Sequence, residues 1–313
     1  MEDGLILVYK KKGKTSRNVV ENISKRYGVK AGHIGTLDPM AKGLLPVLVG
    51  NTCKLSKYLM EHDKTYLVEM KFGYNTETLD IEGEILEEDK SFRENNIVDN
   101  EFFDMIIIAM KKELGTKKQI PPIYSAKKLN GKKLYEIARK DKEKAIEMAK
   151  EKAKEITIYN MYDISLKELW DNNPKDILLS FKVECSSGTY IRSLVRDIAE
   201  NMGTIAIMTD LRRIAVGNYN KIDNIIEDID EDENINEEEI ILKKYTEEEV
   251  LKDNFKNNIN LDKDRKKAFL VGLSTRVNKD KYNDGIYLVN IEGEVIGLRR
   301  NKKWRNKKKV CNK

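Results

Sequence analysis

Residues 32–46 contain the side chain that is best suited to carry out chemistry. The segment reads GHIGTLDPMAKGLLP, so one carboxylate, Asp38, lies between glycines and a proline. Glycine allows backbone conformations that other residues disfavour, and Pro39 restricts Asp38 to an extended conformation. An acid on such a loop, followed by an apolar run, is suited to act as a nucleophile or a general base. Asp-Pro is also ordinary turn chemistry, so this segment alone leaves a simple turn open.

Several other short segments combine charged, aromatic and turn-forming residues. They are Asp63-Lys64-Thr65-Tyr66, residues 119–127, residues 131–139, residues 185–194 and Leu211-Arg212-Arg213. Together with residues 32–46, these segments resemble the TruB-type tRNA pseudouridine synthases. The pattern Gly-His-x-Gly-Thr-Leu-Asp-Pro-x-Ala-x-Gly-x-Leu-Pro is similar to the active-site signature of that family, and the other segments follow in the expected order. The resemblance extends from about residue 5 to about residue 217.

The resemblance implies an aspartate-based isomerisation of uridine to pseudouridine that needs no cofactor. Asp38 matches the catalytic aspartate, which could attack C1′ of the ribose, add to C6 of the uracil, or abstract the 2′ hydrogen. In each route Asp38 must be ionised. Arg192 matches the arginine that pairs with this aspartate, and an arginine fork holds a carboxylate in fixed geometry. Tyr66 matches the tyrosine that stacks on the flipped-out base, and Tyr190 matches a second active-site tyrosine.

The same resemblance suggests four substrate-binding residues. Leu211 matches an apolar residue of the uracil pocket, and His33 matches the histidine that enters the space vacated by the flipped base. Lys10 aligns with a lysine of an early Lys-Pro-x-Gly segment, although Lys11 replaces the proline here. Lys127 lies in a proline-stiffened segment that would border the active site and help to position RNA.

Composition narrows the possible classes of protein and site. The chain has 313 residues and a net charge of +5, and lysines and arginines crowd its last fifteen residues. A basic tail of this density is typical of a polyanion-binding surface, although a solvated terminus that binds nothing can have the same composition. Three dispersed cysteines and two histidines predict neither a disulfide framework nor a metal site. No apolar run has the roughly 20 residues of a membrane span, so we expect a cytoplasmic protein.

Periodicity predicts a mixed fold. We expect strands near residues 5–9, 66–73 and 177–185, and helices at 15–27, 102–114, 132–155 and 194–202. This pattern, read with the resemblance, predicts an α/β (α+β) catalytic domain over residues 1–250, with a mixed, largely antiparallel sheet. An acidic run at 223–239 would repel RNA and is expected to be a solvated surface. Residues 251–313, with paired strands at 285–290 and 294–298, are expected to form a small PUA-like RNA-binding β domain.

The expected partner is the T stem-loop of tRNA, modified at uridine-55 in the conventional tRNA numbering by a monomer that needs no metal, no cofactor and no membrane. Two alternatives remain at this stage. One keeps the chemistry but moves the substrate to ribosomal RNA with guide RNAs. The other is an RNA-folding chaperone that remodels tRNA without turnover, and both activities could coexist because base extrusion already requires a loop to open.

Overall fold

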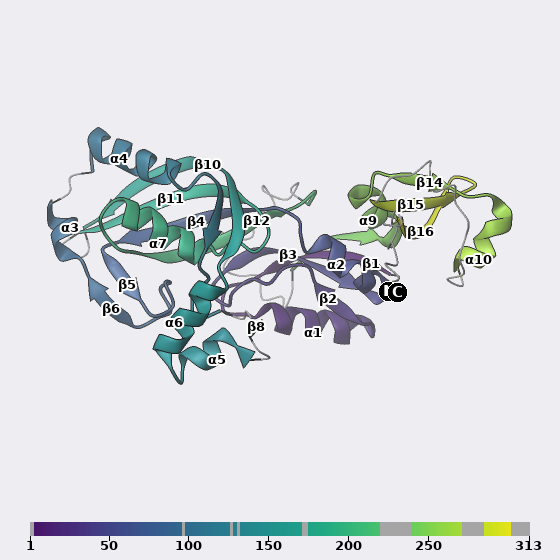
Figure 1. Cartoon of the computed structure of the whole chain (residues 1–313), viewed down its shortest axis with the longest axis horizontal. Coiled ribbons are helices and arrows are strands. Elements are labelled where there is room, and N and C mark those ends of the chain that lie inside the picture. Colours follow the sequence, from purple (N-terminus) through teal and green to yellow (C-terminus); the bar gives the residue numbers. More distant parts are fainter. Residues whose placement is uncertain are drawn as a thin grey trace, which may run out of the picture.

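The computed structural model describes residues 3–95, 98–125, 128–129, 132–170, 175–219, 240–270 and 285–301. Nine strands of this described part form one sheet in the order β13-β1-β3-β12-β4-β11-β10-β7, with β2 also paired to β3 (Figure 1). The strands are β1 (Gly4–Lys10), β2 (Ala31–His33), β3 (Lys42–Val49), β4 (Lys64–Phe72), β7 (Gly115–Gln119), β10 (Lys154–Leu169), β11 (Asp176–Cys185), β12 (Ala206–Val216) and β13 (Ile240–Thr246). Neighbouring strands are antiparallel except β12 and β3, which are parallel. The predicted mixed, largely antiparallel sheet is confirmed.

Within the described residues, the longer helices are α1 (Ser16–Tyr27), α4 (Asn100–Lys111), α6 (Lys142–Glu151), α7 (Ile191–Asn201) and α9 (Glu247–Asn254). α1 begins where the sequence predicts, because the Thr15 side chain accepts a hydrogen bond from the Asn18 N–H and completes a capping box. Shorter elements connect the rest: η1 (Gly50–Leu55), α2 (Ser56–Leu59), β5 (Tyr74–Thr76), β6 (Ile85–Glu88), α3 (Lys90–Asn95), β8 (Lys128–Leu129), β9 (Lys132–Lys133), α5 (Leu134–Ala138), η2 (Lys263–Arg265) and α10 (Lys266–Leu270).

β1 is buried on both faces, which explains its uninterrupted apolar sequence. Ile6 and Val8 point into a cluster with α1, while Leu5 and Leu7 point into a second cluster that includes residues of α9. Side chains alternate across a strand, so one short apolar run serves both layers. This packing fixes the start of the chain beneath the loop that carries Asp38.

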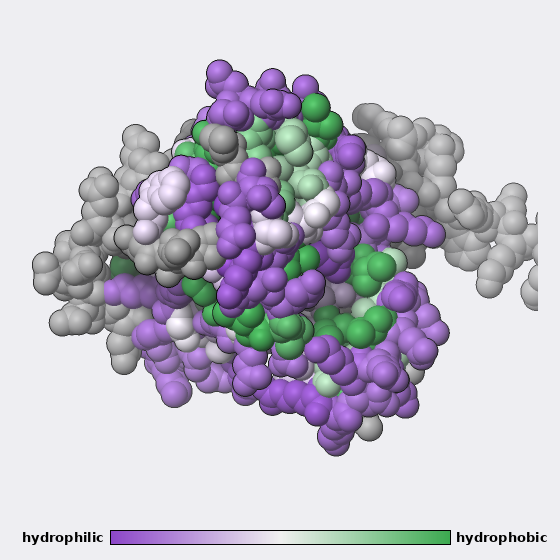
Figure 2. Space-filling model, turned by 90° about the vertical axis from the view of Figure 1, so that its left-hand side faces the viewer, coloured by the Kyte–Doolittle hydropathy of each residue, from purple (hydrophilic) through white to green (hydrophobic). Residues whose placement is uncertain are grey.

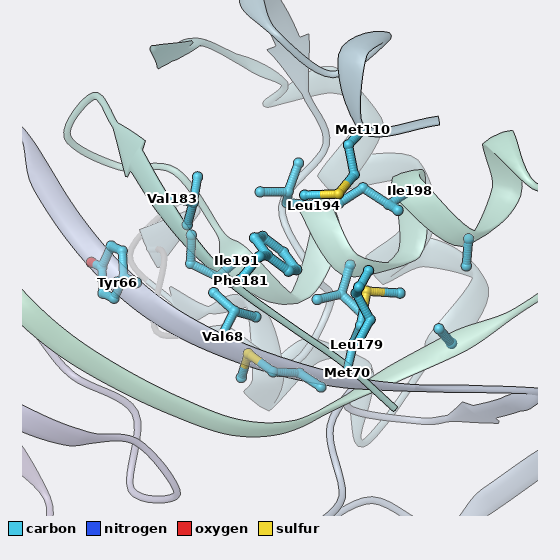
Figure 3. Close-up of a cluster of buried hydrophobic side chains, with 14 of the residues drawn as sticks. Tyr66, Val68, Met70, Met110, Leu179, Phe181, Val183, Ile191, Leu194 and Ile198 are labelled. Atoms are coloured by element: carbon cyan, nitrogen blue, oxygen red, sulfur yellow. The ribbon is translucent and has the colours of Figure 1, made fainter. Parts of the chain in front are cut away.

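The half of the sheet around β4 is covered on one face by α4 and α7. β4 alternates between buried and half-buried residues, and Tyr66, Val68 and Met70 all lie on its buried face. In Figure 3, Tyr66 lies at one end of this cluster, and its hydroxyl points away from the apolar side chains. The core therefore extends up to the candidate active site and holds Tyr66 at its edge.

The prediction of one long helix over residues 132–155 is wrong. The segment instead contains β9, α5 and α6, and β10 begins at Lys154. Asp141 is the N-cap of α6, where its carboxylate accepts a hydrogen bond from the Lys144 N–H at 3.0 Å. An N-cap residue has a non-helical backbone, so Asp141 starts a new helix rather than continuing the previous one.

A second, three-stranded sheet contains β14 (Asn258–Asn260), β15 (Gly285–Ile291) and β16 (Glu294–Asn301). β15 and β16 form the predicted hairpin, and Glu292 and Gly293 at its turn both have positive φ angles. The proposed domain boundary after residue 250 falls within α9. The acidic run at 223–239 and the basic tail beyond residue 301 lie outside the described residues.

Figure 2 looks onto the end of the molecule that carries α3, β5 and β6. Hydrophilic side chains cover most of this face, and hydrophobic ones form a band between them. Ile85 and Leu86 of β6 are more than half exposed. In the part of the chain that is described, no helix is long and apolar enough to cross a membrane.

Candidate active site

Asp38 lies in the loop between β2 and β3, at the first position of a tight turn. The Ala41 N–H donates to the Asp38 carbonyl at 3.1 Å, and Pro39 occupies the second position of the turn. Proline is favoured there because its ring fixes φ near the value that the turn requires. Both interpretations of the Asp-Pro pair therefore apply: the residues form an ordinary turn, and that turn presents the Asp38 carboxylate.

The loop is held by side chains from the first 16 residues of the chain. The Ser16 hydroxyl, which is buried, donates to the Leu37 carbonyl at 3.0 Å and accepts from the Leu37 N–H at 2.9 Å. The Lys10 ammonium donates to the carbonyls of Pro39 at 3.2 Å, Lys14 at 2.6 Å and Lys11 at 3.1 Å. The residues on both sides of Asp38 are thus fixed before any substrate arrives. Lys10 is fully buried and holds this loop, and its predicted contact with substrate stays a prediction.

Arg213 of β12 supports the same loop from the opposite side. Its guanidinium is fully buried and donates to the carbonyls of Leu44 at 2.8 Å, Gly35 at 3.0 Å and Thr36 at 3.3 Å. It also forms a hydrogen bond with the Tyr66 hydroxyl. Gly35 has φ of +123°, and a Cβ there would lie 3.3 Å from Arg213. Arg213 therefore connects the Asp38 loop to Tyr66, a connection that the sequence did not reveal.

Arg192, in the first turn of α7, pairs directly with Asp38. Its Nη2 lies 2.8 Å from Oδ2 of Asp38, and its Nη1 lies 3.4 Å from Oδ2 of Asp80. The remaining donors reach backbone carbonyls, at 2.8 Å for Thr78 and 3.2 Å for Tyr124. The predicted pairing of Asp38 with Arg192 is present through one guanidinium nitrogen, while the other nitrogen of the fork faces Asp80.

Asp80 is a second carboxylate that the sequence interpretation missed. It is 4% exposed, and its Oδ1 accepts from the Thr78 hydroxyl at 2.5 Å and from the Glu82 N–H at 3.1 Å. Its other oxygen faces Arg192, so one guanidinium bridges a buried carboxylate and a more exposed one. The Thr-x-Asp spacing was the available signal, but it is equally typical of an ordinary Asx turn.

A cavity of about 500 Å³ opens above this ion pair. The Asp38 side chain is 40% exposed, so a substrate in the cavity can reach its carboxylate. Tyr66 and Leu211 contribute the largely buried surface of the cavity, and Tyr190 lies beside Asp38 and Arg192. The other lining residues are Gly35, Thr36, Leu37, Met60, Glu61, Lys64, Ser125, Lys154, Ser187, Gly188, Thr189 and Ile191.

Residues 119–125 run alongside the N-terminal turn of α7. The Gln119 amide accepts from the Tyr190 N–H at 2.8 Å and donates to the Tyr190 carbonyl at 3.1 Å. The Ser193 hydroxyl donates to the Ile120 carbonyl at 3.0 Å. The proline-stiffened segment therefore does border the cavity, while Lys127 lies outside the described residues. His33 is on β2 and does not belong to the described set of lining residues, so its predicted entry into the RNA stack stays a prediction.

Burial sets the protonation of several groups around the cavity. Burial, together with a smaller effect of the nearby Arg213, lowers the pKa of Lys64 to about 8. Burial likewise lowers the pKa of Lys10 to about 8, against the opposing effect of Asp38. Burial raises the pKa of Tyr66 to about 12, so its hydroxyl is neutral under physiological conditions. In the described residues no group of acidic, histidine or cysteine side chains has a geometry that could hold a metal ion.

These pKa values predict how stability depends on pH. Lys10 and Lys64 have a pKa near 8 in the folded chain, whereas an unfolded lysine has a pKa near 10.4. Between pH 8 and pH 10.4, each of them is therefore less protonated in the folded chain than in the unfolded chain. The unfolded chain then binds more protons, so the free energy of unfolding rises with pH, by at most about 1.4 kcal/mol per pH unit for each lysine. Denaturant titrations from pH 8 to 9.5 should show this rise.

The titrations end at pH 9.5 because above that pH the buried tyrosines make the free energy of unfolding fall as pH increases. Tyr66 has its pKa raised to about 12, so the folded chain binds the extra proton there and stability falls as pH increases. Lys10→Met should flatten the rise between pH 8 and 9.5, and Lys12→Met, on the exposed part of the same turn, should not. A free energy of unfolding that falls over this window in the wild type would contradict the buried-lysine account.

Comparison with known proteins agrees with this geometry. Residues 21–191 match the TruB family pseudouridylate synthase N-terminal domain, and residues 192–252 match the tRNA pseudouridylate synthase B C-terminal domain. A relative from Clostridium kluyveri, named tRNA pseudouridine synthase B, is 36% identical over 97% of this chain and 98% of its own length. This chain belongs to the TruB family. A second relative of that name, from Clostridium perfringens, is 42% identical over 74% of this chain and 72% of its own.

Solved structures share the fold of this TruB family member. A chain of a Cbf5-Nop10-Gar1 complex superposes with a TM-score of 0.59 at 21% identity, over 95% of this chain and 78% of that one. A chain of an H/ACA RNP bound to a substrate RNA containing 2′-deoxyuridine also gives a TM-score of 0.59, at 19% identity. At these identities the likeness concerns the fold alone.

Arg213 offers a test of how the family's signature loop is held. Arg213→Lys keeps a cation but cannot donate to Gly35, Thr36, Leu44 and Tyr66 together, so buried carbonyls lose their partners. We expect a loss of about 2 kcal/mol in the free energy of unfolding and a fall of up to about 100-fold in kcat as the Asp38 loop shifts. Denaturant titration and single-turnover kinetics measure the two effects.

The matched control is the neighbouring Arg212→Lys. Arg212 points to the other face of β12 and is half-buried, so the same substitution should leave kcat within about threefold of the wild type. Equal effects of the two substitutions on kcat would show that Arg213 acts only through the general stability of β12.

Proposed function

We propose that this chain isomerises uridine to pseudouridine in the T loop of tRNA, at uridine-55 in the conventional tRNA numbering. The observation that carries the proposal is the 2.8 Å ion pair between Arg192 and a 40% exposed Asp38, at the wall of a cavity that also contains Tyr66 and Leu211. Family membership supplies the substrate, and the cavity supplies a site for one nucleotide.

The chemistry requires one carboxylate and no co-reactant. The N1–C1′ bond of the uridine breaks, the uracil turns, and a C5–C1′ bond forms while C5 loses its proton and N1 gains one, so substrate and product are isomers. Asp38 would act at C1′, at C6 or at the 2′ hydrogen, and each route needs its ionised form. Arg192 favours that form and orients it, because a guanidinium stays charged when it is buried.

The target base must leave its stack to reach Asp38. Bases that enzymes modify are extruded from the stack into a pocket, where aromatic and apolar side chains contact their faces. Tyr66 is suited to that contact because it is neutral and because Arg213 and the β4 core fix its ring. Leu211, on the adjacent strand β12, supplies a second apolar surface, and Tyr190 lies close enough to Asp38 to contact the ribose or the base.

The remaining assignments rest on the same family membership. We also propose that the chain acts as a monomer. We assign residues 1–250 to the catalytic domain and residues 251–313 to a PUA-like RNA-binding domain that would contact tRNA outside the T loop. A tRNA substrate also supports a cytoplasmic location. Phosphate contacts by lysine and arginine would make binding strongly dependent on salt.

The experiment that tests this function compares two unmodified tRNA transcripts. One has uridine at position 55, and the other has cytidine there with all other nucleotides unchanged. Pseudouridine should form in the first transcript only, with the product mapped by nucleotide. Equal yields from both transcripts would place the target elsewhere, and no yield from either, with tRNA still bound, would favour the chaperone alternative.

A further inference from the structure

Two lysines line the catalytic cavity without an ion-pair partner among the described residues. Arg192, the third cation of the lining, already faces the carboxylates of Asp38 and Asp80. Lys154 donates to the Ser187 carbonyl at 3.0 Å, and Lys64 donates to the Met60 carbonyl at 3.4 Å and also to the His62 carbonyl. Both ammonium groups are therefore held by neutral carbonyl acceptors, and the nearby Asp63 only partly opposes the effect of burial on the pKa of Lys64.

The position of Lys154 depends on the turn that it crosses. Lys154 is the first residue of β10 and is exposed, and its ammonium lies against the turn formed by Ser186, Ser187 and Gly188. Gly188 has φ of +84°, and a Cβ there would lie 2.6 Å from Nζ of Lys154. A glycine at this point lets the lysine lie over the turn and keeps its charge at the rim of the cavity.

Lys64 extends the positive charge inward. Its side chain is 7% exposed, and its Cε lies 3.3 Å from where a Cβ on Gly35 would be, so it packs against the Asp38 loop. Lys154 is close enough to contribute to the lowered pKa of Lys64. The two cations thus form one positive strip, from the exposed rim at Lys154 to the buried wall beside Gly35.

A nucleotide in this cavity must bring its phosphates to the rim. Building on the proposed function, we propose that Lys154 and Lys64 form a phosphate site, which takes a phosphodiester flanking the extruded uridine. Lysine binds phosphate as a compact point charge, without the bidentate geometry that arginine imposes. With the base against Tyr66 and the ribose at Asp38, the flanking phosphate is the anionic group of the substrate nearest to this strip.

A chemical double-substitution cycle tests the proposal. T stem-loop RNAs are made with a neutral methylphosphonate at the phosphate 5′ or 3′ to the target uridine, and with unmodified phosphates as reference. Equilibrium binding is measured for the Asp38→Asn protein with and without Lys154→Gln, so that no RNA is converted. We expect Lys154→Gln and one of the methylphosphonates each to weaken binding about 5- to 10-fold, and the combination to weaken it no further.

Salt dependence and two further variants complete the test. Lys154→Gln should reduce the slope of log affinity against log salt by about 0.7 to 0.9, the value for one phosphate contact. Gly188→Ala should weaken RNA binding as Lys154→Gln does, although it changes no charge. Lys111→Gln, on α4 away from the cavity, is the control and should leave the effects of the methylphosphonates on affinity unchanged. The phosphate site would be overturned if, for both methylphosphonates, the loss of affinity in the combination equals the product of the losses caused by Lys154→Gln and by the methylphosphonate alone. Absence of pseudouridine with wild-type protein and unmodified RNA would instead reject the proposed function.

Discussion

Asp38→Asn should abolish pseudouridine formation while leaving tRNA binding nearly intact. The amide is close in size to the carboxylate, but it is neither a useful nucleophile nor a base, so we expect single-turnover rates to fall by at least about 10⁴-fold. Arg192 would keep its contacts with Asp80, Thr78 and Tyr124, so the cavity should keep its shape. Rapid-quench kinetics with excess enzyme measure the rate, and filter binding measures the affinity.

The control for Asp38→Asn is Asp210→Asn on β12. Asp210 pairs with Lys42 at 3.3 Å and does not belong to the described lining of the cavity, so its variant should retain normal rates.

Asp38→Asn also separates the two activities considered for this chain, the synthase and the RNA-folding chaperone. A chaperone that works without turnover keeps its effect on tRNA folding in Asp38→Asn. Substantial pseudouridine formation by Asp38→Asn would show that another group carries the chemistry.

Arg192→Lys should be nearly as damaging, although the charge is retained. A lysine ammonium cannot span Asp38 and Asp80 while donating to two backbone carbonyls, so we expect kcat to fall by at least about 100-fold. It would also leave Asp80, which is 4% exposed, without its matched partner. Removing one partner of a buried pair typically costs about 3 to 5 kcal/mol, so the free energy of unfolding should fall as well.

A double variant separates the catalytic effect from the stability effect. Arg192→Lys combined with Asp80→Asn no longer buries an uncompensated carboxylate, so much of the stability should return while kcat stays low. Arg196→Lys is the matched control, since Arg196 lies one turn further along α7, is half-buried and pairs with Asp197 at 2.6 Å. Recovery of kcat together with stability in the double variant would mean that Arg192 serves only to fold the site.

The part of the site that the sequence could predict is the part carried by long, ordered motifs. Asp38, Arg192, Tyr66 and Leu211 lie in four separate segments, and the sheet brings all four to one cavity. Their elements follow from plain signals: the alternation of β4, the Thr15 cap of α1, and the apolar run of β1. Sequence order alone does not give the distances, but these elements leave the four residues little freedom to lie elsewhere.

The supporting residues could not be predicted because only packing distinguishes them. Arg212 and Arg213 are adjacent and chemically identical, yet the pleat of β12 buries one beneath the Asp38 loop and leaves the other half-buried. Lys10 belongs to a run of surface-like lysines, and its burial follows from its place at the end of β1. The helix predicted over residues 132–155 failed for a local reason, since the composition is helical but Asp141 caps a new helix.

The most direct test of the central claim is a structure of the Asp38→Asn protein bound to a tRNA T stem-loop. We expect the target uridine to be extruded into the cavity of about 500 Å³, with its base against Tyr66 and Leu211 and its C1′ next to the side chain at position 38. A complex in which the T loop keeps this uridine stacked, or places a different nucleotide in the cavity, would contradict it.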